Sequence, residues 1–173
     1  ARRLGEPAFS VSFHGAGEPT VAWDLYCHLV QYTRRAARQR GLVSTVTTCT
    51  NGVMSRSRAT WIAKNTDYVS LSLDGLEEAQ NALRPKADGS GSFAAIRRTM
   101  AIFDEHHLNY MVRGTVCQDN VDQLPAFVAW LCDHCGPDSI QFEPMLTDGR
   151  CFSSKCQGPA DADFVNAFAA ASE

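Results

Sequence analysis

The sequence has no long hydrophobic run and no excess of basic residues in its 173 positions. No apolar stretch approaches the roughly 20 residues that a membrane-spanning helix needs, so we expect no membrane partner. Lys and Arg number 16 against 19 Asp and Glu, and the resulting net charge of −3 gives no reason to expect nucleic acid as a partner. The basic residues near position 1 are followed by no apolar segment, so no secretion signal is predicted.

Cysteine, in contrast, is plentiful, with seven residues in this length. Without a secretion signal, we expect reduced thiols in the cytoplasm or metal ligands rather than a disulfide framework. Cys132, Cys135, Cys151 and Cys156 form two pairs whose spacing is near that of a four-thiolate zinc or iron–sulfur site. The competing explanation is that Cys132 packs as a small hydrophobe and that the two pairs, separated by an expected strand, never meet.

Apolar periodicity predicts strands that alternate with helices along the whole chain. Strands are expected at residues 8–13, 42–48, 68–73, 110–116 and 139–143, and helices at 21–40, 54–65, 76–83, 92–107, 121–134 and 161–171. In the first helix, the buried face is expected to carry Leu25, Leu29, Tyr32 and Ala36. The alternation predicts an α/β fold whose parallel βα units form an open sheet or part of a barrel, with no linker dividing it.

Polar or ionisable residues follow every expected strand, at positions 14–15, 50–52, 74–75, 117–119 and 143–144. Because ligands collect at the carboxyl ends of parallel strands, this pattern is typical of a binding site. Turns and helix caps also favour such residues, and that is the competing explanation. Asp74 follows the third strand, where it could act as a catalytic base, orient a substrate or cap the turn.

The turn at residues 13–20 is the most informative stretch. It lies between a strand and a helix and contains Gly15, Gly17, Glu18 and Pro19, so a ligand can approach its backbone closely. An acid beside a rigid proline suits an amine-bearing ligand better than a pyrophosphate. The turn resembles the dinucleotide fingerprint, but Thr20 stands where the third glycine belongs and no acid ends the next strand. The sequence contains no phosphate-binding lysine motif and no serine nucleophile elbow.

Taken in order, several stretches resemble the radical S-adenosylmethionine superfamily. They are residues 12–20 (Ser-Phe-His-Gly-Ala-Gly-Glu-Pro-Thr), 50–52 (Thr-Asn-Gly), 70–75 (Ser-Leu-Ser-Leu-Asp-Gly), 84 (Arg), 91–93 (Gly-Ser-Phe) and 140–144 (Ile-Gln-Phe-Glu-Pro). The chain is most similar to the branch of sulfatase-maturating enzymes and SPASM-like peptide maturases, whose turn typically reads Gly-Gly-Glu-Pro. The resemblance implies a partial (β/α)6 TIM-like barrel, of which residues 1–173 would form one domain containing strands two to six.

The resemblance also implies a site for S-adenosylmethionine. The turn at Gly17, Glu18 and Pro19 would hold the amino group of this cofactor, and Ser72 and Arg84 would hold its carboxylate, a group that favours charge-assisted contacts. The end of the last strand would face the adenine. The expected cofactor-binding residues are Gly15, Gly17, Glu18, Pro19, Asn51, Ser72, Arg84, Phe142 and Glu143.

One element of the family is missing. Its four-iron four-sulfur cluster is held by a Cys-x-x-x-Cys-x-x-Cys loop, and no cysteines in this sequence have that spacing. We therefore expect a piece of a parent enzyme that lacks the first βα unit and is inactive alone. The parent would modify a peptide or protein side chain by hydrogen abstraction. The alternatives are a cluster-less binding module, a structural four-cysteine metal site, or auxiliary-cluster ligation by Cys151 and Cys156.

Overall fold

The structure, a computed structural model, describes residues 5–15, 17–145 and 157–172. Its strands form one sheet in the order β1-β2-β3-β4-β5, and every neighbouring pair is parallel. The strands are β1 (Ala8–Phe13), β2 (Val43–Thr50), β3 (Tyr68–Ser72), β4 (Tyr110–Val116) and β5 (Ser139–Pro144). Each crossover therefore moves the chain one strand further in the same direction, as in a βα barrel.

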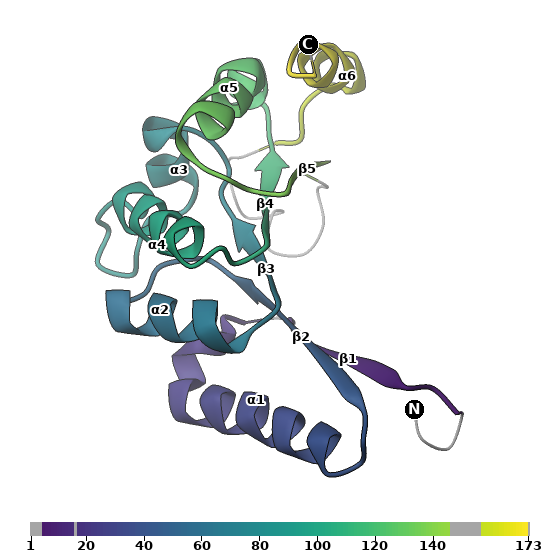
Figure 1. The fold of residues 1–173 in the computed structure, drawn as a ribbon. Coiled ribbons are helices and arrows are strands. Elements are labelled where there is room, and N and C mark those ends of the chain that lie inside the picture. The colour runs from purple at the N-terminus through teal and green to yellow at the C-terminus, as the bar shows by residue number, and fades with distance from the viewer. Residues whose placement is uncertain (1–4, 16, 146–156, 173) are drawn as a thin grey trace.

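Helices connect the strands and lie along one side of the strand ribbon (Figure 1). They are α1 (Trp23–Arg38), α2 (Arg56–Asn65), α3 (Glu77–Leu83), α4 (Phe93–Glu105), α5 (Leu124–His134) and α6 (Asp161–Ala170), with short 3-10 turns η2 (Pro19–Ala22) and η3 (Val121–Gln123). None of the helices within the described ranges has both the length and the apolar character that crossing a bilayer requires. The predicted α/β order of elements is confirmed.

The two faces of the sheet differ in character. In β4, Tyr110, Val112 and Val116 are buried against the helices, whereas Arg113 and Thr115 project from the other face. Parallel sheets covered on both faces consist of nearly continuous apolar runs, so this alternation is unusual for them. It fits a sheet that is covered on one face and turns a polar face toward the inside of a partial barrel.

The face of α1 that packs against the sheet differs from the expected one. Leu25, Leu29 and Tyr32 are 58%, 39% and 56% exposed, and the buried residues are Tyr26, Val30, Thr33 and Ala37. The two sets are offset by one residue, and both recur at helical spacing. Tertiary contacts select the buried set, because the Tyr26 hydroxyl is hydrogen-bonded to the Thr48 Oγ1 at 2.7 Å and the Tyr26 ring packs edge-on against Trp61. The prediction for Leu25, Leu29 and Tyr32 is therefore wrong.

Candidate functional site

A cavity of about 430 Å3 lies at the carboxyl edge of the sheet, and we call it the sheet-edge cavity. Many of the residues expected to bind the cofactor line it, although they come from five separate parts of the sequence. Its lining consists of His14, Gly15, Gly17, Glu18, Cys49, Thr50, Asn51, Ser72, Arg84 and Arg113. Six of the nine expected residues thus meet at one site, while Pro19, Phe142 and Glu143 are not part of its lining.

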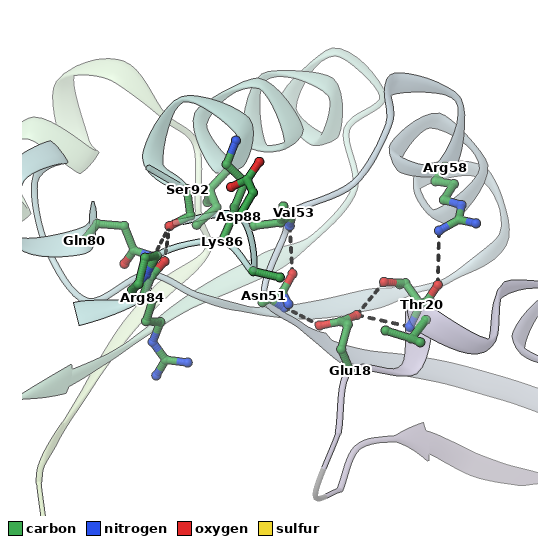
Figure 2. Close-up of a pocket in the computed structure, with 14 residues that line it drawn as sticks. Glu18, Thr20, Asn51, Val53, Arg58, Gln80, Arg84, Lys86, Asp88 and Ser92 are labelled. Carbon is green, nitrogen blue, oxygen red and sulfur yellow. Dashed lines mark hydrogen bonds between the residues drawn. The ribbon is translucent and has the colours of Figure 1, made fainter. Parts of the chain in front are cut away.

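The Glu18 carboxylate accepts four hydrogen bonds from the protein, three on Oε1 and one on Oε2. Its Oε1 accepts hydrogen bonds from the Thr20 backbone N–H at 3.1 Å, the Thr20 hydroxyl at 2.7 Å and the Thr50 hydroxyl at 2.9 Å. Its Oε2 accepts from the Asn51 backbone N–H at 2.7 Å, and Figure 2 shows the side chain between Thr20 and Asn51. Glu18 therefore ties the turn after β1 to the end of β2.

The turn after β2 is fixed by its own residues. The Asn51 Oδ1 accepts a hydrogen bond from the Val53 N–H at 2.8 Å, and Gly52 has a φ of 72°. A Cβ at Gly52 would lie 2.6 Å from the Leu71 Cδ1, so the position needs glycine both for its backbone angle and for space. This turn holds Asn51 at the rim of the sheet-edge cavity.

Arg84 reaches the cavity from the end of α3 and is held there by Asp74. The Arg84 Nε forms an ion pair with the Asp74 Oδ2, and the Arg84 Nη2 donates to the Thr115 Oγ1 at 3.3 Å. The other carboxylate oxygen of Asp74 accepts from the Thr115 backbone N–H at 2.9 Å. Since the Asp74 side chain is 5% exposed and both its oxygens have partners, its surroundings are those of a carboxylate that orients a neighbour. A catalytic role for Asp74 stays a prediction.

The residues expected near the adenine lie on opposite faces of β5. The Phe142 ring is partly buried over Gly114 and lies 6.0 Å from the Phe127 ring of α5, on the side of the helices. Glu143 forms an ion pair with Arg113, whose side chain lines the sheet-edge cavity. The side chain of Phe142 is thus turned away from the polar face of the sheet, and Glu143 approaches the cavity through Arg113.

A second cavity of about 550 Å3 opens on the helix side of the same edge (Figure 2). It shares Glu18, Asn51 and Arg84 with the sheet-edge cavity and adds Arg58 and Lys86. Arg58 is already engaged, because its Nη1 donates to the Thr20 carbonyl at 3.3 Å and its guanidinium lies 4.9 Å from the centre of the Trp23 ring. Although it is the larger of the two cavities, it contains neither Gly17 nor Ser72, so it matches the expected site less well.

The structure describes two of the four cysteines that the sequence suggested as a metal site. Cys151 and Cys156 lie outside the described residues. Cys132 is exposed, and Cys135 is half-buried at the end of α5. Burial, followed by the nearby Asp104 carboxylate, raises the pKa of Cys135 to about 11. In the part of the chain that the structure describes, no three His, Cys, Asp or Glu side chains come together as a metal site.

Some lining residues were not expected from the sequence. His14 and Thr50 were anticipated only as strand ends, and Cys49 and Arg113 were not anticipated at all. The alternation in β4 is a usable signal for Arg113, because a charged residue between the apolar Val112 and the close-packed Gly114 must project from the polar face. Cys49 carries no comparable signal, since a cysteine packs equally well on either face.

No family model matches the sequence. Among solved structures, anSMEcpe with bound AdoMet and Kp18Cys peptide is similar with a TM-score of 0.69 and 23% identity, over 79% of this chain and 38% of that one. A domain of pyruvate-formate lyase-activating enzyme from Bacteroides vulgatus is similar with a TM-score of 0.66 and 17% identity, over 94% and 92% of the two chains. For Streptococcus suis SuiB the TM-score is 0.59 and the identity 16%, over 94% and 35%.

The chain therefore has the fold of these proteins, part of a TIM-like barrel of parallel βα units. It spans well under half the length of anSMEcpe and of SuiB, and nearly the whole of the lyase-activating enzyme domain. At sequence identities of 16–23%, these structural similarities establish the fold alone. The function has to be argued from the residues of the site.

Proposed function

We propose that this chain is the core of a radical S-adenosylmethionine enzyme, that it binds S-adenosylmethionine in the sheet-edge cavity, and that the complete enzyme modifies a peptide or protein side chain. The observation that carries this proposal is the convergence of six expected residues, from Gly15 to Arg84, on that one cavity. The proposal is supported by the fold that this chain shares with anSMEcpe, a protein whose structure contains bound AdoMet.

The donors and acceptors of the cavity suit the amino-acid end of the ligand. Arg84 offers a planar guanidinium and Ser72 a half-buried hydroxyl, which together match a carboxylate. The exposed turn containing Gly15 and Gly17 offers backbone carbonyls to an ammonium group, and the Glu18 Oε2, which accepts only the Asn51 N–H, adds a carboxylate oxygen. Pro19 begins η2 and thereby fixes the direction of this turn. The adenine would extend toward the end of β5, where Arg113 and Glu143 lie.

The iron–sulfur cluster does not fit the residues that the structure describes. A four-iron four-sulfur cluster needs cysteine thiolates, and the sequence contains no Cys-x-x-x-Cys-x-x-Cys triplet. In the superfamily that the sequence resembles, this cluster supplies the electron that makes the bound ligand reactive. We propose that its ligands belong to a βα unit outside residues 1–173, so that this chain alone binds the ligand without turning it over.

The free side of β1 supports such a further unit. Among the described residues β1 pairs only with β2, and beside it α1 exposes Leu25, Leu29 and Tyr32. A neighbouring βα unit would pair with the open strand edge and cover this apolar stripe with its helix. Leu29→Asp tests the point in the complete protein. A truly exposed leucine would tolerate the change within about 0.5 kcal/mol, whereas a covered one would cost more than about 2 kcal/mol.

Two observations support a peptide or protein as the substrate. Structures of anSMEcpe contain the peptides named Kp18Cys and Cp18Cys, and this chain presents a polar sheet face of the kind that lines a partial barrel. We also propose a cytoplasmic location, which fits the five described cysteines being free thiols.

A cluster-less binding module is the second candidate, because the missing cysteine triplet is a specific observation in its favour. The two functions are separated by anaerobic purification of the complete protein, followed by iron analysis and S-adenosylmethionine cleavage under reducing conditions. The enzyme function predicts at least about four irons per chain, the content of one four-iron cluster, and release of 5′-deoxyadenosine. Ligand binding without iron and without cleavage would leave the binding module as the function.

A further inference from the structure

Asp74, Gln80, Arg84 and Ser92 form a closed ring of hydrogen bonds beside the sheet-edge cavity. The Asp74 backbone N–H donates to the Gln80 Oε1 at 2.7 Å, and the Gln80 Nε2 donates to the Ser92 Oγ at 2.9 Å. The Ser92 hydroxyl donates to the Arg84 carbonyl at 2.7 Å, and the Arg84 Nε closes the ring on the Asp74 carboxylate. Asp74, Gln80 and Ser92 are buried, so the ring is a rigid frame for one arginine.

The ring fixes where the Arg84 guanidinium points. Its planar group has five N–H donors, of which the Nε is held by Asp74 and one on Nη2 by the Thr115 hydroxyl. Two fixed nitrogens define the plane, so the Nη1 edge has one orientation. The Arg84 side chain is 40% exposed and lines both cavities at the carboxyl edge, so its remaining donors are accessible to a ligand.

We propose that Asp74 is a positioning residue that orients Arg84 toward the carboxylate of the bound ligand. The inference rests on the proposed function, because the ligand is taken to be S-adenosylmethionine. An arginine that is already ordered loses little side-chain freedom when the ligand binds, and this preorganisation raises affinity for the group that it faces. Gln80 and Ser92 act with Asp74 by holding the arginine's backbone.

The same strand provides a matched control at its other end. Asp67 precedes β3, and its Oδ2 accepts from the Arg34 Nη2 at 2.7 Å and from the Val46 backbone N–H at 2.6 Å. This repeats the chemistry of Asp74, which accepts from one arginine and from one strand N–H. Asp67 lines neither of the two cavities at the carboxyl edge. The Asp67 side chain is 44% exposed and that of Asp74 is 5% exposed, so Asp67→Asn controls for the loss of an arginine-paired carboxylate outside the ligand site and not for the loss of a buried one.

The test compares two ligands that differ only in the carboxylate. The complete protein, its Asp74→Asn variant and its Asp67→Asn variant are titrated calorimetrically with S-adenosylmethionine and with decarboxylated S-adenosylmethionine. We expect Asp74→Asn to weaken binding of the first ligand at least tenfold and of the second less than twofold, and Asp67→Asn to change neither by more than twofold. Equal losses for both ligands, or no loss for either, would overturn the positioning role.

Two further outcomes distinguish a failure of this inference from a failure of the proposed function. If the unsubstituted protein binds neither ligand, the proposed function fails. If it binds S-adenosylmethionine and Asp74→Asn binds it equally tightly, only the inference fails. If Asp74→Asn does not fold, the test is the solvent exchange of the Arg84 Nε–H in the NMR spectrum of the unsubstituted protein. This resonance is assigned by its absence from the spectrum of Arg84→Lys. We expect the Arg84 Nε–H to exchange with solvent more slowly at pH 7 than the Nε–H of the exposed Arg38. Equally fast exchange would contradict the hydrogen-bonded ring that fixes Arg84.

Discussion

The Glu18 carboxylate accepts a hydrogen bond from the Asn51 backbone N–H at 2.7 Å across 33 positions of the sequence. The same carboxylate accepts hydrogen bonds from the hydroxyls of Thr20 and Thr50. Glu18 thus holds the turn after β1 against the end of β2, and the walls of the sheet-edge cavity depend on it. Under the proposed function, we expect Glu18 to contribute to ligand binding through the shape of this turn.

Glu18→Gln tests this role. The amide N–H2 would face donors instead of accepting from them, so we expect the free energy of unfolding to fall by about 1–3 kcal/mol. S-adenosylmethionine affinity should fall as well, because the turn is released. Urea denaturation and calorimetry measure the two effects, with Glu105→Gln on the exposed end of α4 as the control. Loss of affinity at unchanged stability would instead indicate direct contact between Glu18 and the ligand.

Gly52→Ala separates a backbone requirement from a packing requirement. Gly41 has a φ of 63° with nothing within 4 Å of a Cβ, whereas Gly52 has a φ of 72° and a Cβ there would meet Leu71. We expect Gly41→Ala to cost about 1–2 kcal/mol for its left-handed backbone. Gly52→Ala should cost a further 1–3 kcal/mol, roughly, for the overlap with Leu71. Thermal denaturation of the two variants checks the order, and equal losses would show that Leu71 adjusts freely.

The hydrogen bond between Tyr26 and Thr48 is expected to select the buried face of α1. Tyr26→Phe leaves the Thr48 hydroxyl buried without its partner and should cost about 1–2 kcal/mol, and Thr48→Val should cost a similar amount. The double variant Tyr26→Phe/Thr48→Val removes both polar groups, so its cost should be less than the sum. Urea denaturation of the four proteins gives the coupling energy, and a value near zero would contradict a specific role for this bond.

Cys135 should react slowly and should couple stability to high pH. With a pKa raised to about 11 by burial, its thiolate at pH 8 is about a hundredfold scarcer than for an unperturbed cysteine, and its alkylation by iodoacetamide should slow accordingly. On folding the thiol holds its proton more tightly than in the unfolded chain. Between about pH 9 and pH 11 the unfolded state therefore loses its proton first, and stability falls as the pH rises.

The control for this pH dependence is Cys135→Ala. The decrease in urea midpoint from pH 9 to pH 10.5 should be smaller in this variant than in the unsubstituted protein. An identical decrease in both would assign the effect to other groups, of which Tyr110 and Tyr26 are candidates because burial raises the pKa of both hydroxyls, that of Tyr26 to about 12.

The resemblance to the radical S-adenosylmethionine superfamily supplied the expected cofactor-binding residues, and a topological rule explains why most of them meet. Gly17 and Asn51 follow β1 and β2, Ser72 ends β3 and Arg84 follows α3, and the carboxyl ends of parallel strands meet at one edge whatever the side-chain packing. Local patterns of turns and alternating residues were enough to locate those strand ends. The same signals gave the order of strands and helices.

What the sequence could not show depends on contacts between distant residues. Two offset apolar stripes on α1 satisfy the same helical period, and only Thr48 and Trp61 decide between Tyr26 and Leu25. The buried Gln80 looks like an ordinary helix residue until its partners are known. Nor does the sequence show where the Phe142 side chain lies: its ring packs over Gly114 near Phe127 of α5 and does not line the sheet-edge cavity.

The most direct measurement of the central claim is the affinity of the complete protein for S-adenosylmethionine, with and without Arg84→Ala. We expect binding by the unsubstituted protein and a loss of at least tenfold in the variant, because a guanidinium that contacts a carboxylate is worth about 1.5–3 kcal/mol. Arg38→Ala on the exposed end of α1 should bind as tightly as the unsubstituted protein. Unchanged affinity in Arg84→Ala would contradict the assignment of the sheet-edge cavity to this ligand.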